Sequence, residues 1–92
     1  MEKLLEIGRT VFDDEINSLI KAKAALGIDF TTAVKLIAQS NKVIISGVGK
    51  SGIIGKKIAA TLSSVGVSSV FLHPVEALHG DIGMVQSGDV AI

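Results

Sequence analysis

The fold is decided by residues 43–52, Val-Ile-Ile-Ser-Gly-Val-Gly-Lys-Ser-Gly. The β-branched run at 43–45 is typical of a short parallel strand that is buried on both faces. Glycines at positions 47, 49 and 52 follow, and a helix is predicted from about Ser51 to Val65. Strand, glycine-rich turn and helix in this order indicate an α/β unit with a parallel sheet.

Two further strands are predicted after this unit. Residues 69–72 form the second strand, residues 73–84 form a loop in which a helical turn fits, and residues 89–92 begin a third strand. The side chains of the 51–65 helix that are expected to face the sheet are Ile54, Ile58, Ala59 and Leu62. The predicted fold class is α/β, with N-terminal helices followed by part of a Rossmann-like parallel sheet in a three-layer αβα sandwich.

Residues 1–42 differ from this region, because they carry twelve of the eighteen charged side chains. Apolar residues recur at Leu5, Phe12, Leu19 and Leu26, which predicts an amphipathic helix ending at Gly27. Asp29 is expected to cap a second helix, roughly Phe30 to Gln39. The inner face of that helix is expected to consist of Phe30, Val34, Leu36 and Ile37.

The composition suits one small domain and disfavours several functions. The chain has 92 residues and is 48% apolar, which is enough for one core but too little for two domains. Nine basic and nine acidic side chains cancel, so no positive field favours nucleic acid. There is no cysteine, no signal-peptide pattern and no suitable bilayer span, so we expect a cytoplasmic protein without a membrane segment.

The apolar ending at residues 90–92 resembles the start of a strand. We therefore expect the chain to be an N-terminal fragment. Its predicted parts are a helical segment, 1–42, and the first half of a domain, 43–92, truncated at the third strand.

The glycine-rich loop is a candidate anion site at the carboxyl edge of the sheet. Its backbone N–H groups and the following helix N-terminus favour a phosphate, and Lys50 and Ser51 add a cation and a hydroxyl. A simple strand-to-helix turn, with Ser51 as N-cap, explains the same residues. A Walker loop is excluded because Ile44 stands where it needs glycine, and a dinucleotide fold lacks its acid until Glu76.

The loop after the second strand is the other candidate, and it is expected to lie beside the glycine-rich loop, because parallel strands share one carboxyl edge. It contains two imidazoles and two carboxylates, namely His73, Glu76, His79 and Asp81. This set suits proton transfer near neutral pH, or a metal held by the two histidines. Each residue also has a structural explanation, as the end of a strand, the cap of a turn or a partner for the backbone.

Together these motifs resemble the sugar isomerase (SIS) domain of the arabinose 5-phosphate isomerase family. The matching segments are Gly47-x-Gly49-Lys50-Ser51-Gly52, Ala59-Ala60-Thr61-Leu62 and His73-Pro74-x-Glu76-Ala77-x-His79-Gly80-Asp81-Ile82-Gly83-Met84. The resemblance implies an aldose–ketose isomerase that interconverts D-arabinose 5-phosphate and D-ribulose 5-phosphate through an enediol(ate). In many Gram-negative bacteria this reaction feeds synthesis of the octulosonate sugar of lipopolysaccharide.

The resemblance also implies roles for individual residues. Lys50 and His79 would be catalytic, and the substrate-binding residues would be Gly49, Ser51, Gly66, Val67, His73 and His79. No cofactor would be required, and an inhibitory or structural divalent ion such as zinc at His73 is left open. Val67 departs from the family, which has threonine there, because valine offers no side-chain hydrogen bond.

The resemblance further implies a homo-oligomer, a tetramer for the full-length parent, with a sugar phosphate as substrate. The family's serine-rich phosphate loop and catalytic glutamates fall beyond Ile92, so we expect the 92-residue chain alone to be inactive. Two alternatives stay open. They are a non-catalytic phosphosugar-binding SIS module and, less favoured, a dinucleotide-binding domain.

Overall fold

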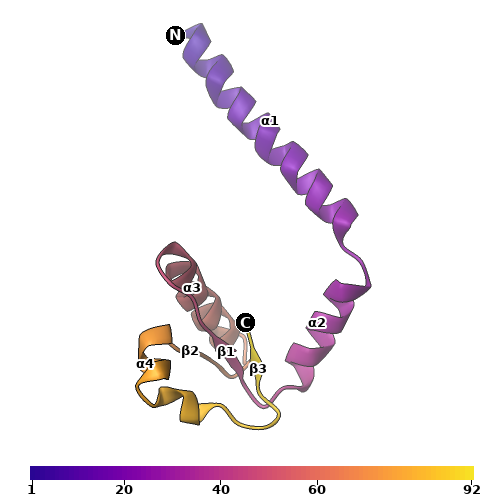
Figure 1. Cartoon of the computed structure of the whole chain (residues 1–92). Helices are drawn as coiled ribbons and strands as arrows, with labels where there is room; N and C mark the ends of the chain where they lie inside the picture. The colour runs from indigo at the N-terminus through magenta and orange to yellow at the C-terminus, as the bar shows by residue number, and fades with distance from the viewer. The chain divides into compact units, whose positions relative to one another are not determined.

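The structure, a computed structural model, describes the whole chain from Met1 to Ile92 (Figure 1). In chain order the elements are α1 (Glu2–Ala25), α2 (Ile28–Gln39), β1 (Val43–Ile45), α3 (Lys50–Ser64), β2 (Ser69–Phe71), α4 (Pro74–Leu78), the 3-10 helix η1 (Asp81–Met84) and β3 (Val90–Ala91). The predicted α/β fold class is confirmed. The segment 73–84 is more ordered than predicted, because it holds both α4 and η1.

The three strands form one parallel sheet with the order β2-β1-β3. Val43 pairs with Ser69 on one side and with Val90 on the other. The central position of β1 explains why its three side chains are only 0–3% exposed. The prediction of a fully buried first strand is confirmed.

Helix α3 packs on the sheet through its smallest residues, which corrects the predicted inner face. Gly52, Gly55 and Ala59 are its buried residues, whereas Ile54 and Ile58 are 59% and 40% exposed. A Cβ atom added at Gly55 would lie 3.0 Å from Cγ2 of Ile45, so the helix and strand are too close for a branched side chain between them. The expected inward positions therefore hold only for Ala59 and the half-buried Leu62.

Helix α2 also differs from its prediction. It begins at Ile28, so Asp29 lies inside the first turn, where a carboxylate interacts favourably with the helix dipole, and is not the cap residue. Of the expected inner face, Ile37 packs against the core, whereas Phe30, Val34 and Leu36 are 48–54% exposed.

The chain divides into two compact units, residues 1–32 and residues 33–92. Helix α1 makes up most of the first unit and has no buried residue. Large apolar side chains along it, including Leu5, Phe12 and Leu19, are more than half exposed. None of the helices combines the length and apolar content that a bilayer-crossing helix needs.

Side-chain hydrogen bonds fasten β3 to β1 at the amino edge of the sheet. Nζ of Lys42 lies 2.6 Å from Oδ2 of Asp89, and the backbone N–H of Gln86 donates to the same oxygen at 2.7 Å. The Asp89 side chain is only 1% exposed. The hydrogen bond from Lys42, followed by that from Gln86, lowers the pKa of Asp89 below its ordinary value.

Candidate functional site

The carboxyl ends of the strands form the edge from which both candidate loops leave the sheet. The backbone N–H of Leu72 donates to the carbonyl of Ile45 at 2.8 Å, and that of Ser46 donates to the carbonyl of Ile92 at 2.9 Å. These bonds continue the ladder past the last paired residues of β1. They confirm that the loop after β1 and the loop after β2 begin side by side.

The glycines of the first loop are required by its own geometry. Gly49 is the N-cap of α3 and has a φ of 62°, a backbone conformation that favours glycine. A Cβ atom added at Gly52 would lie 2.7 Å from the carbonyl oxygen of Gly47, so these two backbones touch. The loop is thus a tight turn that brings the first turn of α3 onto the end of β1.

Lys50 and Ser51 begin α3, and both are exposed. Because Gly49 takes the cap position, the alternative of Ser51 as N-cap is wrong, and no side chain caps this helix. The free N–H groups of the first turn, the Ser51 hydroxyl and the Lys50 ammonium therefore occupy the same end of the helix. Such an end attracts negative charge on a ligand.

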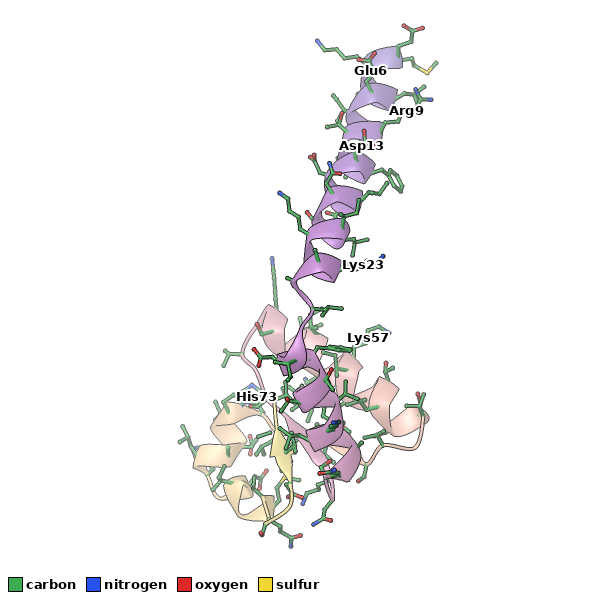
Figure 2. All side chains as sticks on the ribbon, turned by 90° about the vertical axis from the view of Figure 1, so that its right-hand side faces the viewer. Glu6, Arg9, Asp13, Lys23, Lys57 and His73 are labelled. Carbon is green, nitrogen blue, oxygen red and sulfur yellow. The ribbon has the colours of Figure 1, made fainter.

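His73, labelled in Figure 2, lies two residues after the end of β2 and is the N-cap of α4. Its Nδ1 atom accepts a hydrogen bond of 3.1 Å from the backbone N–H of Val75. Pro74 takes the first helical position, where the lack of an N–H costs nothing. The imidazole is exposed, with one nitrogen engaged by the helix.

The Phe71 ring connects the two loops, a role that the sequence analysis missed. The ring lies 3.6 Å from a Cβ position at Gly52 and 3.2 Å from one at Gly55, so it fills the notch that these glycines leave. Its centroid is 6.4 Å from that of the His73 ring in an edge-on arrangement. Lys56 places its ammonium 5.4 Å from the same centroid. His73 and the start of α3 are therefore neighbours.

His79 ends α4, where it is the C-cap residue and is exposed. Gly80 follows with a φ of 118° and turns the chain into η1. Glu76 and Asp81 lie in the first turns of α4 and η1, respectively, and both are exposed. The short helix thus separates the two imidazoles, with His73 at its start and His79 at its end.

The fold and this edge of the sheet agree with a comparison to known families. The SIS domain family matches residues 36–92. The chain belongs to this family. The expectation drawn from the glycine-rich and histidine-rich motifs is thereby confirmed.

Several relatives of this SIS domain carry names that describe an activity. The chain is 49% identical to the arabinose 5-phosphate isomerase GutQ of Escherichia coli K12 over 99% of its own length and 29% of that protein. It is 49% identical to the arabinose 5-phosphate isomerase KdsD of Pseudomonas aeruginosa over 86% of its length and 24% of that protein. A solved structure from E. coli CFT073, a complex with arabinose 5-phosphate, superimposes with a TM-score of 0.81 and 37% identity, covering 97% of this chain and 48% of that one. The chain therefore spans about 29% of the length of the first of these relatives.

Gly66 and Val67 lie away from the edge that holds the other site residues. They follow the C-terminal end of α3, where Gly66 has a φ of 91° and Val67 packs against the core. Helix α3 has 15 residues, about 22 Å of rise, and returns the chain from the carboxyl edge to the start of β2. Within one SIS domain the structure does not bring these two residues to Lys50 and His73.

The residues around His73 do not fit a divalent metal ion. No group of three or more His, Cys, Asp or Glu side chains in the chain could hold one. Nδ1 of His73 is already an acceptor for the Val75 N–H. Nε2 would have to give up its proton to bind a metal.

An apolar hollow of about 450 Å³ lies next to this edge. It is lined by Ile44, Ser46, Leu72, Pro74, Ala77, Leu78, Ile82, Val85, Ala91 and Ile92. The lining contains no titratable side chain. The groups able to do chemistry are therefore on the exposed loops and not in the hollow.

Proposed function

We propose that this chain supplies part of the active site of an enzyme that interconverts D-arabinose 5-phosphate and D-ribulose 5-phosphate. The observation that carries the proposal is the pairing, at one edge of the sheet, of the cationic start of α3 with the imidazole of His73. A sugar phosphate that undergoes isomerisation needs both kinds of group. The arabinose 5-phosphate held by a structural relative supports this substrate class.

The reaction moves a proton between C2 and C1 of the sugar through an enediol(ate). A base must remove the proton from C2, a donor must polarise the C1 carbonyl, and negative charge develops on its oxygen. Lys50 is suited to stabilise that charge, because it is the first residue of α3 and brings a positive charge to the same end of the helix as the free N–H groups. Ser51 and the amide of Gly49 would form the polar wall around it.

The two histidines supply the remaining groups within this chain. His79, at the exposed end of α4, is suited to move a proton, because an imidazole offers both an N–H donor and a lone-pair acceptor. His73 is suited to bind a substrate oxygen. This chemistry requires no cofactor.

We also propose that the protein is a homo-oligomer, a tetramer in its full-length form. The support is α1, a 24-residue helix with no buried residue and with several large apolar side chains more than half exposed. We further propose a cytoplasmic enzyme that feeds lipopolysaccharide synthesis through its octulosonate sugar. Light scattering at tens of micromolar tests the assembly, and a monodisperse monomer would contradict it.

A second candidate is a SIS module that binds sugar phosphates without converting them. Binding alone needs the cation and the hydrogen-bond donors, whereas turnover also needs a correctly placed base. Measurements of binding and of turnover on the same protein distinguish the two.

The direct test is a chimera in which this chain replaces the matching segment of the E. coli GutQ relative. At 49% identity over that segment, most packing contacts should be conserved. We expect the chimera to convert arabinose 5-phosphate and to exchange the C2 proton with solvent. A folded chimera that binds the sugar phosphate but neither converts it nor exchanges the proton would favour the binding module.

A further inference from the structure

The two nitrogens of the His73 ring are not equivalent in this fold. Nδ1 accepts the hydrogen bond of the Val75 N–H at 3.1 Å, so Nδ1 must present its lone pair and cannot carry a proton. A neutral imidazole has one N–H and one lone pair. The proton of His73 is therefore on Nε2.

We propose that the cap of α4 fixes the tautomer of His73, with Nδ1 as the acceptor for the helix and Nε2–H as a hydrogen-bond donor. In this state the ring donates to an acceptor oxygen of a ligand, such as a carbonyl, hydroxyl or phosphate oxygen. It cannot bind a metal ion at either nitrogen without releasing the helix. This role goes beyond the proposed isomerase, because it follows from the hydrogen bonding of one side chain and holds for any ligand.

Three further features stabilise the N-cap that His73 forms on α4. Pro74 has its φ fixed near the helical value, which preorganises the first turn. The His73 carbonyl also accepts the N–H of Ala77 at 3.0 Å, so backbone and side chain both close the turn. The ring stands edge-on to Phe71, which is itself held in the glycine notch of α3.

A metal ion competes with this cap at either nitrogen. Binding at Nδ1 would replace the Val75 N–H directly. Binding at Nε2 needs the other tautomer, in which Nδ1 carries the proton and faces another N–H. In both cases α4 loses its N-cap, and His79 at its other end loses the element that positions it.

His79 is the matched comparison within the same chain. It is exposed like His73, but it caps α4 at the C-terminal end through its backbone N–H, which donates to carbonyls of the helix. Its imidazole is not tied to the helix start. We therefore expect its two tautomers to exchange, and its lone pair to be available to a metal ion.

Imidazole ¹⁵N NMR of the 92-residue chain at neutral pH tests the tautomer. We expect His73 to show one unprotonated Nδ1 and one protonated Nε2, and His79 to show averaged signals. His73→Asn should keep the Val75 amide in its capped position, since asparagine is a good N-cap, whereas His73→Ala should shift it. A His73 ring with averaged signals or a protonated Nδ1 would overturn the proposal.

A zinc titration of the same sample tests the competition. We expect His73 to bind Zn²⁺ about fivefold more weakly than His79, the ratio that an N-cap of ordinary strength sets. The Val75 amide should move toward its position in His73→Ala as His73 takes up the ion. Zinc binding at His73 that is as tight as at His79, with the Val75 amide unmoved, would overturn the proposal and leave the isomerase assignment untouched.

Discussion

The two edges of the sheet use polar side chains in opposite ways. At the amino edge, Lys42 and Asp89 are paired at 2.6 Å, and Asn41 donates to the Ser87 carbonyl at 3.2 Å. At the carboxyl edge, the side chains of Lys50, Ser51 and His79 are exposed, and His73 keeps one free nitrogen. Polar groups at the amino edge hold strands together, and those at the carboxyl edge remain available to a ligand.

Gly88 lies in a tightly packed part of the amino edge, against Asn41. Its φ is 90°, and a Cβ atom added there would collide with the side-chain amide of Asn41. The backbone N–H of Asn41 donates to the Gly88 carbonyl at 2.9 Å. The chain therefore enters β3 along a path that only glycine allows, whereas no comparable contact restrains Lys50 or His79.

The largest expected effect concerns the isomerisation rate of the chain alone, because the side chains at its carboxyl edge are exposed to solvent. The 92-residue chain alone should isomerise arabinose 5-phosphate only at the background rate. Its catalytic candidates are exposed to solvent, so it cannot supply the substrate orientation that is worth about 7 to 11 kcal/mol in a complete site. The measurement is proton exchange at C2 with concentrated chain, and turnover within tenfold of a full-length relative would contradict the expectation.

The second effect concerns Lys50 in the chimera with the E. coli relative. Lys50→Ala should lower kcat by about a hundredfold or more and change KM less, because the lost charge acts mainly on the enediolate. Lys57→Ala is the control, since Lys57 lies on the exposed α3 surface with Ile54 and Ile58. Equal kcat values for the two variants would show that Lys50 takes no part in the reaction.

The third effect tests the close approach of the first loop to α3. Gly52→Ala should lower the free energy of unfolding by about 1–3 kcal/mol, since the added Cβ lies 2.7 Å from the rigid Gly47 carbonyl. Gly8→Ala in α1 is the matched control, where a Cβ meets nothing within 4 Å. It should be neutral or raise helicity. Urea denaturation and circular dichroism measure both, and similar stability of the two variants would contradict the close contact.

The sequence predicted the order and type of the main elements because hydrophobic periodicity and turn glycines are local signals. It also predicted that the loops after β1 and β2 share an edge, which follows from parallel strands. Of the packed face of α3 it predicted Ala59 and Leu62 but not the glycines. Periodicity assigns large apolar residues inward, whereas the short helix–strand distance selects Gly52 and Gly55. The spacing of Gly52, Gly55 and Ala59 was the available signal.

The candidate site was predictable by residue type but not by role. His73 and His79 look alike in the sequence, and only the structure shows that one ring caps a helix and the other does not. Phe71 gave no signal, because an aromatic residue in a strand normally indicates core. Its contacts with the α3 notch and with His73 are long-range and arise only after the sheet has formed.

The smallest expected effect concerns the pH dependence of the amino edge. Hydrogen bonds from Lys42 and Gln86 hold the pKa of Asp89 below its ordinary value of 3.8. A lowered pKa in the folded chain means that the unfolded chain binds its proton first as the pH falls. The stabilisation by Asp89 is therefore complete above a pH of about 3.8. It is lost as the pH falls through the pKa that Asp89 has in the folded chain, which is lower. Asp89→Asn should reduce the free energy of unfolding at neutral pH and weaken its fall at acid pH, which we call the acid limb. Asp81→Asn removes an exposed carboxylate of η1 and is the control, which should leave the acid limb unchanged. Urea denaturation across the acid range measures both variants. Parallel acid limbs for Asp89→Asn and the unsubstituted chain would show that the Lys42–Asp89 pair does not fasten β3 to β1.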